Sequence, residues 1–386
     1  MFSRRLPPHA EPNAITRALA DLRARGTPIA DLTESNPTQV GIDYPSDLLN
    51  ALADARGLEY QPQPFGVRTA REAVAADYGR RGIAIAADRV VLSASTSEMY
   101  SWLFKLLCNP GDRVLAPRPS YPLFEHLTRL EGIEIVPYQL EYHARWEVDI
   151  ASMAVAPGET RAVLLVSPNN PTGSYVTSQE AEAIVRLCKE RGWALVADEV
   201  FAEYPLGGSR PELCFASDAD VLSFSLGGIS KSLGLPQLKV GWVVVGGPAR
   251  DRDAALAGLE LIADTFLSVS TPVQLALPDL LRRGARVREA IHERILSNVG
   301  GMGRIASGYP SCTVLPVEGG WSAVVRVPAT RDEESLTLEL LRQERILVHP
   351  GYFFDFPHEA FIVVSLLPQE DVFADAFDRA LRFASS

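Results

Sequence analysis

Short apolar runs alternate with segments of helical periodicity between about residues 89 and 245. The runs read RVVLSA, DRVLAP, IEIVPY, AVLLVS, WALVAD, DVLSFS and VGWVVV. The clearest helix follows AVLLVS and has apolar residues at i, i+3, i+4 and i+7, namely Ala181, Ile184, Val185 and Cys188. Thr177 and Glu180 form a capping box at its start, and Gly192 supplies a stop. This alternation predicts an α/β fold in which a mostly parallel sheet is covered by helices on both faces.

The remaining segments predict a second, smaller unit. Residues 249 to about 300 have the pattern of long helices, RDAALAGLELIADTFL and LPDLLRRGARVREAIHERIL, and strands are expected near WSAVVRVP and AFIVVSLL. The first 40 residues contain one expected helix, from Pro12 to Gly26, and are too short to fold alone. We therefore predict a large domain at residues 45–275 and a small α+β domain formed jointly by residues 1–44 and 276–386.

The composition is that of a globular protein and disfavours two classes of partner. At 386 residues and 47% hydrophobic content, the chain can bury a large core. The excess of 48 acidic over 37 basic residues gives a net charge of −11, which disfavours nucleic acid and anionic membranes. No apolar run approaches the roughly 18 residues of a membrane-spanning helix, and the four scattered cysteines indicate neither a disulfide framework nor a zinc site. We expect a soluble cytoplasmic protein without a metal.

A loop rich in hydroxyl groups follows the first predicted strand. Ser95, Thr96 and Ser97 crowd the start of a helix, where free N–H groups and the helix dipole favour an anion such as phosphate. Simple helix capping explains the same residues equally well. Parallel sheets bind ligands beyond the carboxyl ends of their strands, and this loop is predicted to lie there.

Three further loops carry chemically useful groups. WALVAD ends in Asp198, a carboxylate that is costly at the end of a buried strand unless it is paired or belongs to a site. Lys231 lies in a Gly- and Ser-rich loop, where a lone lysine is usually a solvated charge. In the turn SPNNPTG, turn chemistry alone explains the prolines, Gly173 and Asn169, whereas Asn170 is the residue that we expect to face a ligand. Four such loops in this order indicate one site.

Together these segments resemble pyridoxal-phosphate enzymes of the aspartate aminotransferase fold type, in the class I/II aminotransferase family. EYQPQPFGVRTAREAVA is similar to the family's tyrosine-then-glycine segment, and NPGDRVLAPRPSYPLF to its next loop. SPNNPTG resembles its asparagine turn, and ADEVF and SK…LKVGW resemble its aspartate and lysine elements. The resemblance covers nearly the whole chain. It implies pyridoxal 5'-phosphate as cofactor and an amine or amino acid together with a 2-oxo acid as substrates.

The resemblance also implies roles for individual residues. Lys231 would hold the cofactor aldehyde as an imine and move the substrate proton. Asp198 would pair with the pyridine nitrogen, Asn170 would donate to the ring 3-oxygen, and Tyr121 would stack on the ring. The residues implied in phosphate binding are Ser95, Thr96, Ser97, Ser230 and Lys239. Tyr60 would reach the phosphate of the neighbouring subunit, which implies a homodimer.

Three positions depart from the family pattern. Phe201 stands where the family usually has a tyrosine that bonds the ring oxygen, so we hypothesise a higher imine pKa. A spectroscopic pH titration that gave a value as low as in relatives with the tyrosine would contradict this hypothesis. Lys239 replaces the usual arginine, which keeps a charge but loses the bidentate fork. Val363 stands where an arginine would grip the substrate α-carboxylate, and no arginine occurs between Arg345 and Arg379.

Few residues are candidates to replace that carboxylate anchor. Arg326 in GGWSAVVRVP is the nearest, but strand alternation puts Trp321 and Arg326 on opposite faces. Arg4 and Arg5 in the N-terminal arm are the other candidates, and exposed arginines are usually just solvated. His349 could line the pocket, although a structural role is the simpler interpretation.

An aminotransferase is therefore expected, and two other functions stay open. A lyase on the same scaffold could perform β-elimination or decarboxylation, because the same lysine, aspartate and asparagine serve any reaction that begins with a Cα carbanion. A non-catalytic module that binds the cofactor as an effector is the third, although the chain has no expected DNA-binding segment outside the scaffold. The sequence does not define the substrate, since the family's carboxylate anchor is absent.

Overall fold

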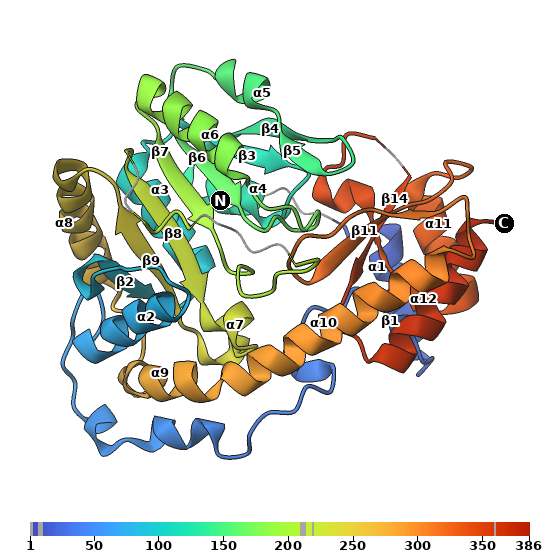
Figure 1. Ribbon diagram of the computed structural model, residues 1–386, viewed down its shortest axis with the longest axis horizontal. Coiled ribbons are helices and arrows are strands. Elements are labelled where there is room, and N and C mark those ends of the chain that lie inside the picture. Colours follow the sequence, from blue (N-terminus) through green and yellow to red (C-terminus); the bar gives the residue numbers. More distant parts are fainter. Residues whose placement is uncertain (1–2, 7–10, 209–213, 218–219, 359) are drawn as a thin grey trace.

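A large mixed sheet forms the centre of the computed structural model, which describes residues 3–6, 11–208, 214–217, 220–358 and 360–386 (Figure 1). Its strand order is β2-β9-β8-β7-β6-β3-β4-β5. The strands are β2 (Val90–Ser93), β3 (Arg113–Arg118), β4 (Glu134–Tyr142), β5 (Trp146–Val148), β6 (Thr160–Val166), β7 (Ala194–Asp198), β8 (Ser223–Gly228) and β9 (Gly241–Gly246). The neighbours β4, β3, β6, β7 and β8 run parallel, whereas β9 and β5 pair antiparallel. The predicted mostly parallel sheet is confirmed.

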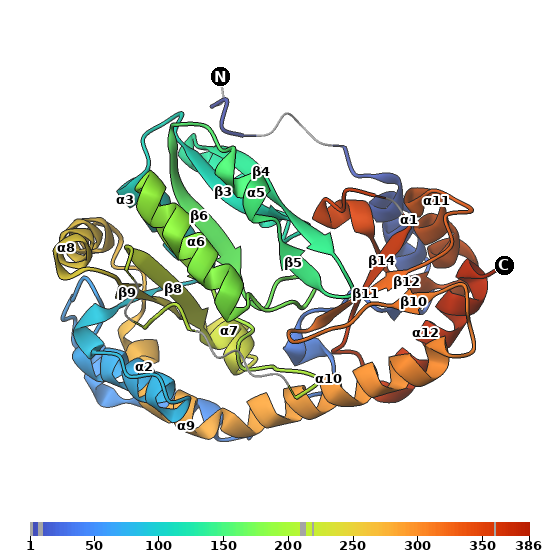
Figure 2. The ribbon, with the colours of Figure 1, turned by 45° about the horizontal axis from the view of Figure 1, so that its top comes forward.

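Helices cover both faces of this sheet, as predicted. The helices are α2 (Arg68–Arg80), α3 (Thr96–Leu107), α4 (Leu123–Glu131), α5 (Ile150–Ala154), α6 (Ser178–Arg191), α7 (Ile229–Ser232), α8 (Ala249–Phe266) and α9 (Thr271–Arg283). On β6, Ala162 and Leu164 belong to the core shared with α3, α4 and α8, whereas Val163 and Leu165 belong to the core shared with α5 and α6 (Figure 2). This period of two follows from the strand pleat and gives β6 a continuous apolar sequence. Burial of each large side chain stabilises the sheet by about 1.5–3 kcal/mol.

The helix α6 has the predicted ends. The Thr177 hydroxyl accepts a hydrogen bond from the Glu180 backbone N–H (3.2 Å), and the Glu180 carboxylate accepts one from the Thr177 N–H (2.7 Å). Gly192 ends the helix with a positive φ of 67°, which glycine adopts without strain. Local sequence therefore sets both boundaries of this helix.

A second, smaller sheet is antiparallel, in the order β10-β11-β14-β13. Its strands are β10 (Thr313–Val314), β11 (Ser322–Arg326), β13 (His349–Pro350) and β14 (Phe361–Ser365), and the helices around it are α1 (Ala14–Ala24), α11 (Glu333–Glu339) and α12 (Glu370–Ala384). The N-terminal segment lies against the C-terminal one, because β1 (Ala30–Asp31) pairs with β12 (Ile346–Leu347). The predicted domain limits at residues 44 and 275 stay a prediction.

The long helical pattern after residue 270 is divided in two. α9 ends at Arg283 and α10 (Ala285–Ala306) begins after Gly284, so LPDLLRRGARVREAIHERIL is not one helix. A Cβ at Gly284 would lie 2.6 Å from the Leu280 carbonyl oxygen, which only glycine avoids. α10 then runs from the large sheet to the small one (Figure 1).

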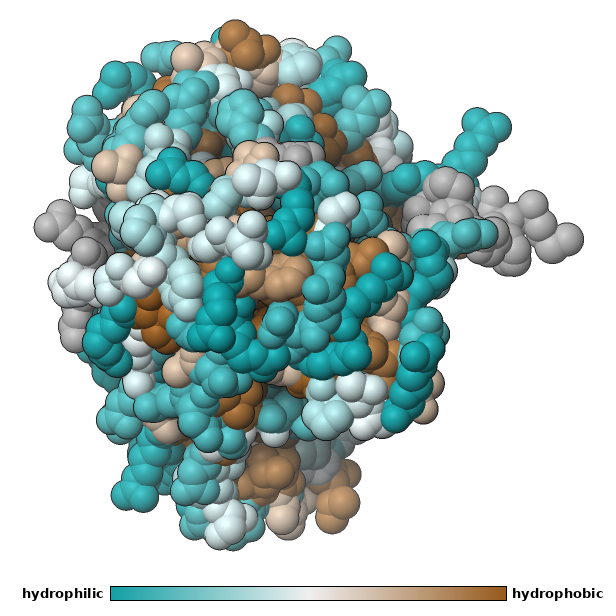
Figure 3. All heavy atoms as spheres, turned by 90° about the vertical axis from the view of Figure 1, so that its right-hand side faces the viewer, coloured by the Kyte–Doolittle hydropathy of each residue, from teal (hydrophilic) through white to brown (hydrophobic). Residues whose placement is uncertain are grey.

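The surface on the side of α12 is mostly hydrophilic, with hydrophobic residues in small, separate groups (Figure 3). Among the described helices, none combines the length and the apolar character that crossing a membrane requires. The most exposed large hydrophobic side chains of the described residues are Leu58, Val155, Tyr60 and Leu261.

Candidate active site

The predicted site residues meet at the carboxyl ends of the parallel strands. Asp198 is the last residue of β7, and its neighbours in the sheet are Val166 on β6 and Leu226 on β8. β6 leads directly into the turn that carries Asn170, and β8 leads into α7, which carries Lys231. The sheet topology thus brings together three loops that are far apart in the sequence.

The Asp198 carboxylate is partly buried and accepts two hydrogen bonds. One comes from the Tyr100 hydroxyl (3.0 Å) and the other from the Val200 backbone N–H (3.2 Å). Burial raises the pKa of Asp198 to about 6, although these two hydrogen bonds oppose the shift. Tyr100 was not among the predicted site residues. Its position four residues after Thr96, on the same face of α3, is the signal that could have indicated it.

Lys231 is held in an aromatic environment. Its Nζ lies 5.7 Å from the centre of the Phe201 ring and 5.1 Å from that of Trp321. Burial lowers the pKa of the Lys231 amine, and the negative charge of Asp198 partly offsets this shift. The Tyr204 hydroxyl donates to the Lys231 carbonyl (2.6 Å) and so fixes the backbone of α7. A lowered pKa leaves more of the amine in the neutral form that attacks carbonyl groups.

The two asparagines of SPNNPTG have different environments. The Asn169 side chain is buried, accepts from the Ser120 hydroxyl (3.1 Å) and donates to the Pro119 carbonyl (3.2 Å). Asn170 is partly buried, and its one side-chain partner in the described structure is the Ser322 hydroxyl, which donates to Oδ1 at 3.4 Å. Asn169 therefore fixes the turn, while the amide N–H groups of Asn170 are left for a ligand.

The start of α3 lies beside the start of α7. A Cβ at Gly241 would lie 3.1 Å from both the Ser95 carbonyl carbon and the Thr96 nitrogen, so the glycine permits this close approach. Gly241 pairs with Gly228, the residue directly before α7. The partly buried polar residues here are Ser95, Thr96, Ser97, Ser230 and Lys231. The Ser95 hydroxyl caps α3 by accepting from the Glu98 N–H (3.1 Å), and the helix start together with the other hydroxyls suits a phosphate group.

The remaining predicted cofactor residues are more exposed. Tyr121 is 45% exposed, and burial together with the charge of Asp198 raises the pKa of its phenol, which places it near that carboxylate. Tyr60 is 78% exposed, and Lys239 is exposed with a left-handed φ of 54°. In the part of the chain that the structure describes, no hydrogen bond or ion pair joins Tyr60 or Lys239 to Lys231.

In the part of the chain that the structure describes, none of the candidate arginines lies at the position where the family has its carboxylate-binding arginine. Val363 is 1% exposed and packs in an apolar cluster. Arg326 is exposed at the far end of β11, four residues beyond Ser322 and therefore about 13 Å away along the strand. Arg5 donates to a carbonyl at the end of α4 (3.4 Å), and Arg4 is exposed.

His349 has the environment of a structural histidine. It lies opposite Val363 in the small sheet, and its ring contacts that of Phe354 edge-on. Burial lowers its pKa, which favours the neutral form.

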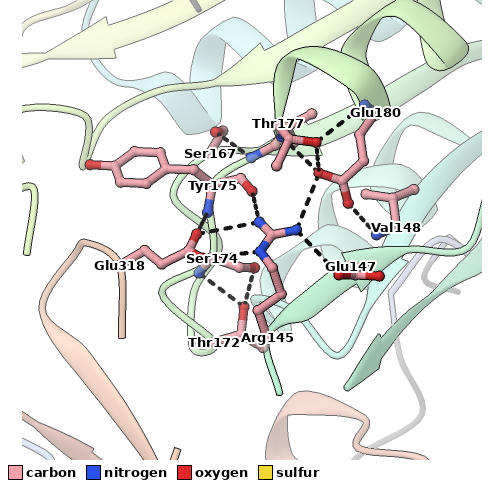
Figure 4. A network of polar contacts seen from close by, with 11 residues as sticks. Arg145, Glu147, Val148, Ser167, Thr172, Ser174, Tyr175, Thr177, Glu180 and Glu318 are labelled. Carbon is pink, nitrogen blue, oxygen red and sulfur yellow. Dashed lines mark hydrogen bonds and ion pairs between the residues drawn. The ribbon is translucent and has the colours of Figure 1, made fainter. Parts of the chain in front are cut away.

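An ion-pair network joins the asparagine turn to the small sheet (Figure 4). The Arg145 guanidinium lies between the carboxylates of Glu318 (3.2 Å), Glu180 (3.6 Å) and Glu147 (3.9 Å). Arg145 also donates to the Tyr175 carbonyl (2.9 Å), and the Glu318 carboxylate accepts from the Tyr175 N–H (2.8 Å). Glu318 lies three residues before Trp321, so the network fixes both sides of the site relative to each other.

Gly173 permits close contact between the backbone of the asparagine turn and the loop before the small sheet. Its φ is +70°, and a Cβ there would lie 2.6 Å from the Val317 side chain and 2.8 Å from the Gly319 oxygen. The Gly173 carbonyl accepts from the Glu318 N–H (3.2 Å). The turn glycine therefore also serves the contact between the two sheets.

The groups at this edge fit pyridoxal phosphate. A carboxylate suits the ring nitrogen, a lysine with lowered pKa suits the aldehyde, an amide suits the ring oxygen, and a helix start suits the phosphate. The Trp321 indole N–H is buried and has no hydrogen-bond partner among the described residues. The fold and these groups together define a pyridoxal-phosphate enzyme of fold type I.

Comparisons with known proteins define the family. The family model for aminotransferase class I and II matches residues 29–372, and the chain belongs to this family. The chain is 26% identical over 373 residues to the glutamate-pyruvate aminotransferase AlaA of Haemophilus influenzae, covering 94% of this chain and 92% of that protein. It is 28% identical over 383 residues to the alanine aminotransferase of Mycobacterium bovis, covering 95% and 88%. The protein is therefore an enzyme that transfers amino groups.

Solved structures agree with this fold. An alanine aminotransferase from Pyrococcus furiosus has a TM-score of 0.87 at 21% identity, over 96% of this chain and 95% of that chain. An aspartate aminotransferase from Thermotoga maritima has a TM-score of 0.83 at 21% identity over the full length of both chains. At this level of identity the likeness concerns the fold alone.

We predict that Glu318→Ala destabilises the protein by about 1–3 kcal/mol, because Arg145 and the Tyr175 N–H lose a partly buried acceptor. We also expect a several-fold loss of kcat/KM, since Asn170 and Trp321 are fixed by this contact. Urea unfolding and steady-state kinetics measure the two effects. Glu147→Ala is the matched control, because it removes a more exposed carboxylate from the same arginine and should change stability by less than about 0.5 kcal/mol. Equal effects of the two substitutions would contradict the prediction.

The raised pKa of Asp198 predicts a pH dependence of stability in the cofactor-free protein. With a pKa of about 6 when folded and about 3.9 when unfolded, this carboxyl binds more protons in the folded state between these values. Burial opposes the ionised form, so the free energy of unfolding that this carboxyl contributes falls as the pH rises from about 4 to 6.

Asp198→Asn should remove this loss and stabilise the cofactor-free protein at pH 7 by roughly 2 kcal/mol. Chemical unfolding at several pH values from 4 to 7 measures the difference between the variant and the wild type. Asp220→Asn is the control, because it removes a largely exposed carboxylate, and it should change the stability by less than about 0.5 kcal/mol. A stability difference for Asp198→Asn that does not change with pH would show the assignment to be wrong.

Proposed function

We propose that this aminotransferase binds pyridoxal 5'-phosphate at Lys231 and moves an amino group between an amino acid or related amine and a 2-oxo acid. The observation that carries the proposal is the position of the partly buried Lys231 at the same sheet edge as Asp198 and Asn170, and the lowered pKa of its amine suits covalent attachment. These are the three groups that the reaction needs around one reacting carbon.

Each proposed contact uses a group that the structure leaves available. Asp198 would face the ring nitrogen, Asn170 would donate to the ring oxygen, and Tyr121 would cover the ring face. Ser95, Thr96, Ser97, Ser230 and Lys239 would hold the phosphate. When bound, the cofactor supplies an aldehyde and a ring that accepts electrons from the substrate Cα. Lys231 would then move the proton, and the aromatic groups around it would exclude water.

We further propose a cytoplasmic homodimer in which Tyr60 completes the phosphate site of the neighbouring subunit. Support comes from Leu58, Tyr60 and Leu261, whose exposed fractions are 91%, 78% and 73%; Val155, at 82%, is the other described large hydrophobic residue above 70%. Side chains of this kind gather at protein–protein interfaces. The four cysteines are free thiols, as is usual in a reducing compartment.

Lys231→Ala tests cofactor attachment. The purified wild type, incubated with pyridoxal 5'-phosphate, should absorb in the visible region, and the variant should lose this absorption because it has no amine to bond the aldehyde. Lys239→Ala is a suitable control, since it weakens phosphate binding but keeps the attachment. A wild type that stays colourless with the cofactor would overturn the proposal.

A panel of amines tests the reaction type. An aminotransferase should lose its visible absorption on addition of an amino donor and recover it on addition of a 2-oxo acid. The names of the relatives make glutamate and pyruvate the first pair to test. A lyase would instead release pyruvate, ammonia or carbon dioxide without a 2-oxo acid, and that result would replace the proposed reaction by elimination or decarboxylation.

A further inference from the structure

Lys231 is carried by a helix that is too short to hold its own backbone in place. α7 has four residues, and a helix of this length forms too few internal hydrogen bonds to be stable alone. At its end, the Lys231 carbonyl accepts a backbone hydrogen bond from the Gly234 N–H at 3.2 Å, the long end of the usual range. Contacts from other segments therefore fix residues 229–234, which we call the lysine turn.

Two tyrosine hydroxyls from distant segments donate to the lysine turn. Tyr204, in the segment after β7, donates to the Lys231 carbonyl (2.6 Å) and lies 3.3 Å from the Ser232 carbonyl oxygen. Tyr44, in the N-terminal segment, donates to the Gly234 carbonyl (2.7 Å). Burial raises the pKa of Tyr44 to about 12 and that of Tyr204 well above its usual value, so both hydroxyls keep the proton that they donate.

Tyr204 is itself held by α10 and by the loop before the small sheet. Its side chain is fully buried, and its ring packs edge-on against the rings of Trp321 and, on α10, His292, with ring centres 5.3 and 6.2 Å away. The Tyr204 carbonyl accepts from the Gly320 N–H (3.0 Å), which fixes its backbone. The hydroxyl is therefore already oriented toward the Lys231 carbonyl, which lowers the entropy cost of this hydrogen bond.

Gly234 lets Tyr44 approach the other end of the lysine turn. Its φ is +63°, and a Cβ there would lie 2.8 Å from the Tyr44 hydroxyl oxygen and 2.8 Å from the Ile291 side chain on α10. Any other residue would therefore displace the hydroxyl or the helix. The N-terminal segment and α10 thus meet at the turn that carries the reacting amine.

The position of this backbone decides where the Lys231 amine can reach. The amine stands at the end of a flexible four-carbon stem, and the rings of Phe201 and Trp321, at 5.7 and 5.1 Å, limit its directions. The backbone sets the point from which the stem starts. Because a misplacement of about 1 Å can lower a rate about a hundredfold, a loosened turn should slow the transfer of a proton.

We propose that Tyr204 and Tyr44 are positioning residues, which hold the lysine turn so that the Lys231 amine meets the proton on the substrate Cα. The proposal rests on the proposed function, in which Lys231 moves that proton. Phe201 stands where the family usually has a tyrosine that bonds the ring oxygen. The tyrosine hydroxyl of this segment, three residues later, bonds the lysine backbone.

Tyr204→Phe tests the proposal in the cofactor-free protein, because it keeps the ring and removes the hydroxyl. The N–H groups of Leu233, Gly234 and Leu235 bond back to the carbonyls of the lysine turn. Their hydrogen exchange should become about tenfold faster once the turn loses its bond to Tyr204. Exchange in α6 should stay within about twofold of the wild type. Mass spectrometry of peptides from the two segments measures both rates.

The same variant, loaded with pyridoxal 5'-phosphate, tests the catalytic consequence. Saturating L-alanine should bleach its visible absorption about tenfold more slowly than in the wild type, counted per protein that carries the absorption. The L-alanine concentration that gives half of the maximal rate should stay within about twofold, because the hydroxyl does not bind substrate. Deuterium at the substrate Cα should slow the variant further, since proton transfer by Lys231 limits its rate.

Tyr138→Phe is the matched control. Tyr138 is 1% exposed, and its hydroxyl donates to the Leu164 carbonyl (2.9 Å) in the interior of β6. This variant should leave exchange in the lysine turn and the bleaching rate within about twofold of the wild type. Equal losses in the two variants would overturn the proposal, because they would reflect the loss of any buried hydroxyl. Unchanged exchange in the lysine turn of Tyr204→Phe, or the absence of a deuterium effect, would also overturn it.

A second variant keeps the test decisive if Tyr204→Phe fails to fold, as circular dichroism would show. Tyr44→Phe removes the less buried hydroxyl and should make exchange in the lysine turn about threefold faster and bleaching about threefold slower. Unchanged values in that variant would overturn a turn held by both hydroxyls. A wild type that stays colourless with the cofactor would contradict the proposed function, whereas exchange in the cofactor-free protein would still decide whether the hydroxyls hold the turn.

Discussion

The placement of Lys231 and Asp198, two partly buried ionisable groups at one sheet edge, is the constraint on which the rest of the structure depends. Burial raises the pKa of the carboxyl to about 6 and lowers that of the amine, so the interior opposes the charge on both groups. Such groups persist only where surrounding interactions hold them. Tyr100 bonds the carboxylate, and Tyr204 bonds the backbone that carries the lysine. The apolar sheet beneath them keeps both residues at one edge, where a bound ring can interact with each.

A second requirement is that two sheets meet at that edge. The large sheet supplies the lysine, the aspartate and the asparagine, while the small sheet and the loop before it supply Trp321 and Ser322. Arg145 and Glu318 hold the two parts together, and Gly173 allows their backbones to touch. Because the partners are 173 residues apart in sequence, the site forms only once these two distant segments have come together. A substitution in this contact can therefore change catalysis without touching a ligand.

The parts of the structure that were predicted are those that local chemistry determines. The alternating apolar runs predicted the large sheet, and the capping box and Gly192 predicted the two ends of α6. The division of the helix at Gly284 was missed, because a single glycine inside a helical pattern is often tolerated. Here any residue with a Cβ would approach the Leu280 carbonyl oxygen too closely, which the sequence pattern does not reveal. Tyr100 and the Arg145 network were also missed, since they depend on contacts across the fold that no periodicity reveals.

The replacement of the arginine by Val363 has a consequence for selectivity. A bidentate guanidinium gives a carboxylate two charge-assisted hydrogen bonds, whereas neutral donors give hydrogen bonds of about half that strength. Discrimination between amines with and without a carboxylate should therefore be tens-fold rather than thousands-fold. Val363 and its apolar neighbours form part of the core and, unlike an arginine, need no buried counter-charge. A site without this cation then relies more on the orientation of its neutral groups, which the contact between the two sheets fixes.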